Sequence, residues 1–184
     1  MSFDMASIAA VLSDDSEPVQ SLFTTMTGRW RASGMKVVGL LGESHGIPDR
    51  KCGAGVVRDI VSGRPFAMYF DTPPKGGSCH LDPAGLEAAS TQLLDQIATS
   101  DLVILSKFGK LETMRAGLIG AFEAAAEAGV PVLTSVSEKH RAAWESFAPG
   151  AAYLAPDAAV LEGWRRGLKG RRIPDSPPIN PLAP

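Results

Sequence analysis

The chain has 184 residues, of which 45% are hydrophobic and 21% are charged, and its formal net charge is -2. This length accommodates one domain with a full core, and the composition is that of an ordinary globular protein. The slight negative charge argues against nucleic acid as a main partner, and the two cysteines are too few for a disulfide scaffold.

Neither a signal peptide nor a membrane span is expected. Residues 1–17 lack a basic start, and their short apolar run is followed by acids. No stretch reaches the apolar length of a membrane span. We therefore expect a cytoplasmic protein, with its oligomeric state open, a homo-oligomer included. A basic cluster follows the last helical pattern and is interpreted as a solvated helix end: Arg165, Arg166, Lys169, Arg171 and Arg172.

Apolar periodicity predicts alternating strands and helices in the first half of the chain. The predicted elements are a strand at 7–13, a helix at 17–34, a strand at 35–44, a hairpin at 53–71 that turns at Ser62-Gly63, and a helix at 81–100. The first helix has Ser16 as a plausible N-cap, Pro18 in its first turn and Gly34 at its end, and Asp82 and Pro83 begin the second.

The second half repeats the alternation. The predicted elements are a buried strand at 101–106, a helix at 113–129, a strand at 130–137, a short helix at 138–148, a weak strand at 151–155 and a helix at 156–170. Residues 171–184 are rich in proline and are expected to form a disordered tail behind a single domain over 1–170.

The expected fold class is α/β. Strands that alternate with helices form right-handed βαβ units, so the sheet should be mainly parallel, in a three-layer arrangement. The hairpin at 53–71 is then an antiparallel insertion in that sheet.

The turn after the first strand, where such sheets often bind phosphate, has the wrong chemistry for a P-loop. A P-loop needs a glycine-rich turn and a lysine, whereas residues 12–21 read LSDDSEPVQS. One carboxylate about 4 Å from a phosphate charge costs about 4 kcal/mol at an effective dielectric of about 20, more than the roughly 1 kcal/mol that a helix dipole offers. Asp14, Asp15 and Glu17 therefore argue against triphosphate binding in the usual way.

The strand at 101–106 runs into the sequence SKFGKLE (106–112), which places a lysine pair at the carboxyl edge of the sheet. Open α/β sheets bind ligands at this edge, so Ser106, Lys107 and Lys110 are candidate anion ligands, and Gly109 lets backbone approach the anion. Lys75 and Ser78 lie in a flexible basic loop that could contact the same ligand. The alternative is that Asp14 or Asp15 pairs with Lys107.

Cys52 and Cys79 flank the predicted hairpin and are expected to lie near each other. With His80 or His45 they could bind zinc or copper, since thiolate and imidazole suit these metals. Four ligands at a recognised spacing are absent, so adjacent thiols without an essential metal are the preferred interpretation. His140 is expected on the exposed side of a short helix, and no cofactor is indicated.

Several motifs resemble the small nucleoside-triphosphatases with a P-loop fold: GLLGES (39–44), VVRDIVSGR (56–64) and VILSKFGKLE (103–112). In that family a later strand ends in an Asp-Glu-Ile-Gly-Lys-Met-Glu-type motif, which Gly109, Lys110 and Glu112 match. Ser106 and Lys107 stand where the family has its magnesium-linked aspartate and catalytic glutamate. The resemblance therefore implies a P-loop-NTPase-like fold whose magnesium site has been lost.

A closer resemblance is to an uncharacterised bacterial family of nucleoside-triphosphatase-like domains, and it covers residues 5 to 165. Its members often read Asn-Lys-Phe-Gly-Lys and Cys-Arg-Leu-Asp where this chain has SKFGK (106–110) and CHLD (79–82), so Ser106 and His80 depart from the family pattern. Genes of that family often lie beside molybdate-transport genes, which implies a role in oxoanion or molybdenum metabolism.

These observations favour a non-hydrolytic, degenerate P-loop-NTPase-like protein that binds an oxoanion or a nucleotide. One alternative is an active nucleoside-triphosphatase that uses Asp14, Asp15 or Glu112 in a rearranged metal site. A second alternative is a protein-interaction module that docks a partner through its sheet edge and tail.

Overall fold

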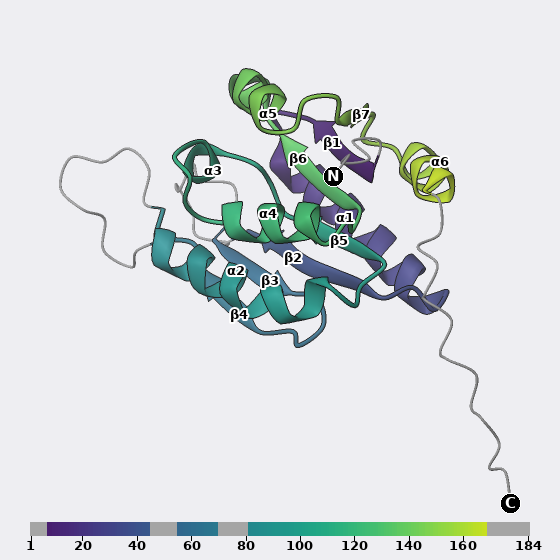
Figure 1. The fold of residues 1–184 in the computed structure, drawn as a ribbon, viewed down its shortest axis with the longest axis horizontal. Coiled ribbons are helices and arrows are strands. Elements are labelled where there is room, and N and C mark those ends of the chain that lie inside the picture. Colours follow the sequence, from purple (N-terminus) through teal and green to yellow (C-terminus); the bar gives the residue numbers. More distant parts are fainter. Residues whose placement is uncertain (1–6, 45–54, 70–80, 169–184) are drawn as a thin grey trace, which may run out of the picture.

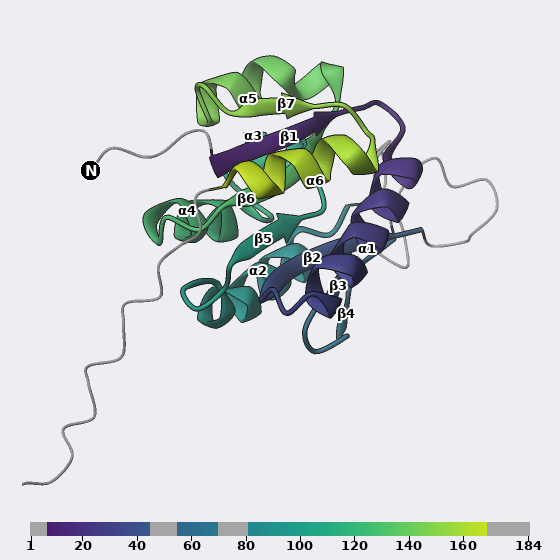
Figure 2. The same ribbon diagram turned by 90° about the vertical axis from the view of Figure 1, so that its right-hand side faces the viewer.

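The computed structural model describes residues 7–44, 55–69 and 81–168. In these residues seven strands form one sheet, in the order β4-β3-β2-β5-β6-β1-β7, with helices on both faces (Figures 1 and 2). The strands are β1 (Ile8–Leu12), β2 (Val37–Glu43), β3 (Val56–Asp59), β4 (Pro65–Ala67), β5 (Leu102–Leu105), β6 (Val132–Val136) and β7 (Ala152–Leu154). The helices are α1 (Ser16–Ala32), α2 (Pro83–Ile97), α3 (Lys110–Thr113), α4 (Ile119–Glu127), the 3-10 helix η2 (Glu138–His140), α5 (Arg141–Phe147) and α6 (Ala158–Gly167).

The sheet is mainly parallel, as the sequence predicts. β2, β5, β6, β1 and β7 pair in parallel, and β3 and β4 add an antiparallel hairpin at one edge. All residues of β5 and β6 are buried, which is typical of parallel strands covered by helices on both faces. The α/β class, the three layers and the inserted hairpin are confirmed, and the arrangement is consistent with a P-loop-NTPase-like fold.

The two faces of the sheet carry separate apolar cores. α1 and α6 pack on one face, where Phe23, Met26 and Leu161 lie among the buried residues. α2, α4 and α5 pack on the other face, where Leu93, Phe122 and Trp144 are buried. α1 and α2 each bury apolar side chains at helical spacing, and their charged residues are exposed. In the part of the chain that the structure describes, no helix is both long and apolar enough to cross a bilayer.

The chain leaves β1 and β6 in opposite directions, which opens a crevice at the carboxyl edge of the sheet. α1 carries the chain from β1 across the first face to β2, whereas α5 carries it from β6 across the second face to β7. β1 and β6 are neighbours in the sheet, so the loops that follow them diverge. Such a switch point is where open α/β sheets bind their ligands.

Several predicted helix boundaries differ from the structure. Ser16 is the first residue of α1 rather than its N-cap, which is Asp15 and makes no side-chain capping bond. The predicted helix over 113–129 is two helices, α3 and α4, separated by a turn in which Arg115 and Gly117 adopt positive φ values of 61° and 65°. The last helix ends at Gly167, three residues early, and Asp157 caps its start by accepting N–H groups from Ala159 and Val160.

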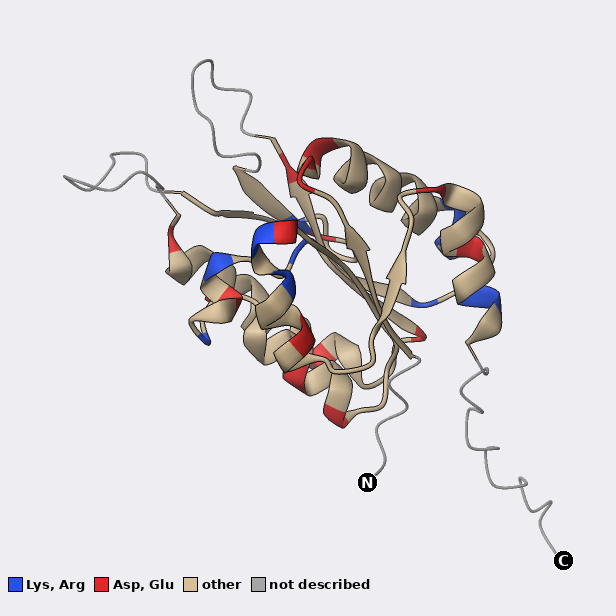
Figure 3. Ribbon diagram, turned by 90° about the horizontal axis from the view of Figure 1, so that it is seen from above, with Lys and Arg blue, Asp and Glu red and all other residues tan. Residues whose placement is uncertain are grey.

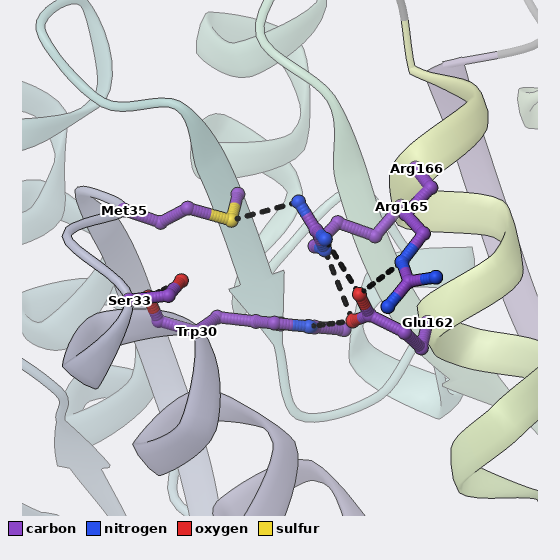
Figure 4. Close-up of polar contacts among 6 residues, drawn as sticks. All are labelled: Trp30, Ser33, Met35, Glu162, Arg165 and Arg166. Carbon is purple, nitrogen blue, oxygen red and sulfur yellow. Dashed lines mark hydrogen bonds and ion pairs between the residues drawn. The ribbon is translucent and has the colours of Figure 1, made fainter.

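A polar cluster joins α6 to α1. The Trp30 indole N–H donates to a Glu162 carboxylate oxygen at 2.6 Å, and Arg165 and Arg166 donate to the same carboxylate at 2.5 and 2.8 Å. Figure 4 shows these side chains converging from the two helices, with Arg165 also reaching Met35. Arg165 therefore links α6 to the segment after α1, whereas Arg166 is exposed and pairs within α6, as the sequence predicts for a solvated helix end. Lys169, Arg171 and Arg172 lie outside the described residues.

Replacement of Glu162 by glutamine should remove the acid sensitivity of this cluster. Hydrogen bonds from Arg165 and Trp30 lower the pKa of Glu162 from 4.5 to about 2. Because the folded pKa is the lower one, the stabilisation is complete above the unfolded pKa and is lost as the pH falls toward 2. Between about pH 7 and about pH 3, urea unfolding should show a loss about 1–2 kcal/mol larger for the wild type than for Glu162→Gln.

The control for this measurement is Glu127→Gln. Glu127 is exposed near the end of α4, so this variant should lose as much stability as the wild type does on acidification. If Glu162→Gln behaved like Glu127→Gln, the cluster would not contribute to the acid response.

Candidate functional site

A cavity of about 380 Å³ opens at the carboxyl edge of the sheet. It lies where the chain leaves β1, β5 and β6, and its lining includes Ser13, Asp14, Ser106, Lys107 and Ser137. Lys and Arg, in blue, and Asp and Glu, in red, are distributed over several of the described helices and loops (Figure 3). At the cavity, the described residues bring together polar side chains from three strand ends.

Ser106 directly follows β5, and two side chains from other elements hold it in place. Its carbonyl oxygen accepts a hydrogen bond from Gln20 Nε2 of α1 at 2.7 Å and one from Ser135 Oγ of β6 at 2.8 Å. Gln20 in turn accepts the Gly42 N–H of β2 at 2.8 Å. The Ser106 residue is only 3% exposed, and its hydroxyl has no partner among the described residues although Ser106 lines the cavity. A buried hydroxyl without a partner is costly, so a ligand oxygen there would be stabilising.

Lys107 is half-buried at the cavity and forms no ion pair with any described residue. Lys110, the first residue of α3, is exposed and also lines the cavity. Gly109 lies between them, and a side chain there would begin 3.7 Å from Lys107 Cε. The structure thus brings both lysines of the SKFGK segment to the same cavity.

Glu112 serves the architecture of the loop that carries the lysines. It is 5% exposed, and its two carboxylate oxygens accept the N–H groups of Gly109 and Leu118 at 2.9 and 2.8 Å. Burial raises the pKa of Glu112, while the N–H groups of Leu118 and Gly109 and the charge of Lys107 act in the opposite direction. Glu112 joins the start of α3 to the start of α4, which explains why the predicted single helix is interrupted here.

Asp14 and Asp15 do not neutralise Lys107 through an ion pair. Asp14 lines the cavity, and its carboxylate accepts the Glu138 N–H at 3.0 Å, at the start of η2. Asp15 is exposed, is the N-cap of α1 and is not among the residues that line the cavity. Of the two acids that the sequence placed near Lys107, only Asp14 reaches the cavity, and it is within 4 Å of neither lysine's ammonium.

The segment after β6 contributes residues that sequence reasoning missed. Ser137, Lys139 and His140 line the cavity, and Ser137 Oγ lies 3.0 Å from His140 Nδ1. Burial, then the charges of Lys139 and Lys107, lower the pKa of His140. His140 is half-buried, so its expected position on the exposed side of a helix is wrong. Ser137, Lys139 and His140 come directly after a buried parallel strand, and this position is the sequence signal that could have identified them.

Some sequence-based candidates lie outside the described residues: Lys75, Ser78, Cys52, Cys79, His80 and His45. The expected proximity of the two cysteines and the expected disordered tail at 171–184 lie outside them as well. Within the described ranges no group of three or more histidine, cysteine, aspartate or glutamate side chains could hold a metal ion.

Comparison with known proteins adds a family and a relative. The family described as "Protein of unknown function (DUF2478)" matches residues 8–164. The molybdenum import ATP-binding protein ModC 2 of Bradyrhizobium diazoefficiens is 31% identical over 168 residues, which are 89% of this chain and 18% of that protein. The chain therefore spans less than a fifth of the length of this relative. No solved structure matches the chain.

Proposed function

Because the chain belongs to the DUF2478 family of proteins of unknown function, we propose that it is a non-hydrolytic, P-loop-NTPase-like protein that binds an oxoanion or a nucleotide. One observation carries the proposal. Lys107 lies half-buried and without an ion pair in the described structure, in the same cavity as the buried Ser106 hydroxyl that has no partner. An anion at this point would neutralise the ammonium group and accept the hydroxyl hydrogen.

The connection between β1 and α1 supports binding without hydrolysis. Only Ser13, Asp14 and Asp15 separate the strand from the helix, which is too short for the eight-residue loop that wraps a triphosphate. Two of these three residues are acids, and none is glycine or lysine. Phosphoryl transfer depends on clamping phosphate and metal, and this turn offers neither clamp.

The residues at the end of β5 support the same conclusion. Lys107 cannot ligate magnesium, and Ser106 offers one neutral hydroxyl where a carboxylate would be the stronger ligand. Two acids of the described residues line the cavity: backbone N–H groups occupy both oxygens of Glu112, and Asp14 accepts the Glu138 N–H. The proposed anion-binding residues are therefore Ser106, Lys107, Gly109 and Lys110, with Asp14 and Glu112 shaping the site. Lys75 and Ser78 remain in the proposal on sequence grounds alone, as does Asp15.

The name of the relative indicates which ligands should be tested first. Its name describes a molybdenum import ATP-binding protein, and the similarity extends over 89% of this chain. On this basis we propose a role in oxoanion or molybdenum metabolism. Molybdate, tungstate, sulfate, phosphate and nucleotides are accordingly the first ligands to screen by thermal shift, where a ligand at a hundredfold its Kd adds about 2.7 kcal/mol of stability.

Replacement of Lys107 by alanine should weaken binding of the anion that the screen identifies by about 1.5–3 kcal/mol, the range for a hydrogen bond to a charged group. Isothermal titration calorimetry measures the change. Lys36→Ala is the matched control, because Lys36 is exposed and precedes β2 at the opposite, amino edge of the sheet. Unchanged affinity in Lys107→Ala would remove this lysine from the site and favour the interaction-module alternative.

Steady-state assays with ATP or GTP and magnesium should show no phosphate release at an ordinary enzyme rate, because the chain lacks the phosphate and metal clamps that transfer requires. The critical variant is Asp14→Asn. Phosphate release by the wild type that this variant abolishes would establish the active nucleoside-triphosphatase alternative and overturn the non-hydrolytic proposal.

A further inference from the structure

Two chemically different groups of residues line the cavity. One group is polar and includes Lys107, Ser106 and the polar residues after β6. The other group, which we call the apolar wall, consists of Met68, Leu81, Leu86, Leu111 and Leu118, which belong to or pack against one apolar core. These five side chains come from the end of the hairpin, the start of α2 and the α3–α4 segment, and they offer no nitrogen or oxygen to a ligand.

A bare tetrahedral oxoanion is too small for this cavity. It has five heavy atoms and occupies on the order of two to three water volumes, where one water takes about 30 Å³. The cavity measures about 380 Å³. An oxoanion bound at Lys107 would therefore leave most of the volume to water. A volume of this size lies in the roughly 300–1,000 Å³ range of pockets that enclose organic molecules.

The phosphates of a nucleotide would suit the lysines, but the rest of a nucleotide is a poor match for the apolar wall. The ribose hydroxyls and the edges of the base need hydrogen-bond partners, and the side chains of the wall provide none. Polar groups that lose water without gaining partners reduce affinity. The wall instead matches a hydrocarbon or aromatic body.

The geometry points to a phosphate ester with an apolar body as the ligand: the phosphate lies at Ser106 and Lys107, and the body lies on the apolar wall. This inference rests on the proposed function, since it places the anion at the same lysine. Among the described residues, Lys107, Lys110 and Lys139 line the cavity. Lysine binds phosphate as a point charge. A phosphate ester also has two or three acceptor oxygens, which can accept hydrogen bonds from several separate lysine donors.

The test compares three probes by isothermal titration calorimetry: inorganic phosphate, glycerol 3-phosphate and phenyl phosphate. Phenyl phosphate should bind roughly tenfold to a hundredfold more tightly than the other two, since burying an aromatic ring is worth about 1.5–3 kcal/mol and 1.4 kcal/mol is tenfold. Trp144 lies 5.2 Å from Phe108 between ring centroids, and Phe108 lines the cavity. Tryptophan fluorescence therefore provides a second readout of occupancy.

Variants distinguish the contribution of the ligand's apolar body to affinity from the contribution of its phosphate. Leu81→Ala should weaken phenyl phosphate several-fold and leave inorganic phosphate unchanged, because Leu81 is only partly buried and belongs to the apolar wall. Leu94→Ala, on an exposed leucine of α2, should change neither. Lys107→Ala should weaken all three probes.

The outcomes distinguish this inference from the function on which it rests. Equal affinity for the three probes, or phenol binding as tightly as phenyl phosphate, would overturn the phosphate-ester inference. If those equal affinities still fell in Lys107→Ala, the proposed anion site would stand. Absence of binding by any anion in the screen, or binding that Lys107→Ala leaves unchanged, would overturn both.

Discussion

Replacement of Gly39 by alanine should destabilise the protein by more than about 4 kcal/mol, the range of substitutions that introduce a severe clash or strain. Gly39 lies in β2 opposite Ile104 of β5, and its φ is 138°. An alanine Cβ would begin 1.9 Å from the Ile104 carbonyl oxygen, which is backbone at the centre of the sheet and cannot move aside. Both the backbone conformation and the close approach therefore require glycine.

Chemical denaturation and the yield of folded protein measure this effect, and Gly28→Ala is the matched control. Gly28 is an exposed residue in α1, and a Cβ there would meet no atom within 4 Å. Alanine should stabilise the helix at that position by up to about 1 kcal/mol. A Gly39→Ala protein within about 1 kcal/mol of wild type would contradict the pairing of β2 with β5.

Glu112→Ala should cost about 3–5 kcal/mol, because it leaves two buried N–H groups, those of Gly109 and Leu118, without acceptors. Each unsatisfied buried donor costs about 1–3 kcal/mol, and the lost side chain leaves a cavity as well. Urea unfolding measures the change. Glu112→Gln keeps one acceptor oxygen and should cost about half as much.

Glu127→Ala is the control for the Glu112 variants, since Glu127 is exposed in α4, and its change should stay within about 0.5 kcal/mol. If Glu112→Ala matched this control, the carboxylate would not organise the α3–α4 segment. Because Gly109 and Lys110 belong to that segment, Glu112→Gln should also weaken anion binding in a protein that remains folded.

Glu112 and Gln20 show how the cavity is held in shape without ligand. Gln20 joins β2 and the end of β5 to α1, and Glu112 joins the starts of α3 and α4. Both act through backbone groups, so the positions of Lys107 and Lys110 follow from hydrogen bonds that the sheet and helices already make. A preorganised site of this kind loses less entropy on binding an anion.

The sequence by itself determined which elements form and much of where they end. Apolar periodicity identified the buried strand that became β5, and Asp82 with Pro83 identified the start of α2, where Asp82 accepts the Ala84 N–H at 2.9 Å. Gly34 and Gly129 end their helices at φ values of 92° and 64°. These features depend on neighbouring residues only, so a local pattern is sufficient to predict them.

The tertiary structure alone decided which strand ends meet. The sheet places β1 beside β6, which brings Ser137 and His140 to the cavity of Lys107, and it gives Asp14 a backbone N–H as its partner in place of that lysine. It also divides the predicted helix at 113–129 into α3 and α4, with Arg115 and Gly117 at positive φ in the turn and the Glu112 carboxylate accepting the Leu118 N–H. Pairings between strands that are far apart in the chain depend on how the whole core packs. The local periodicity of a sequence predicts where strands form but not their order in the sheet.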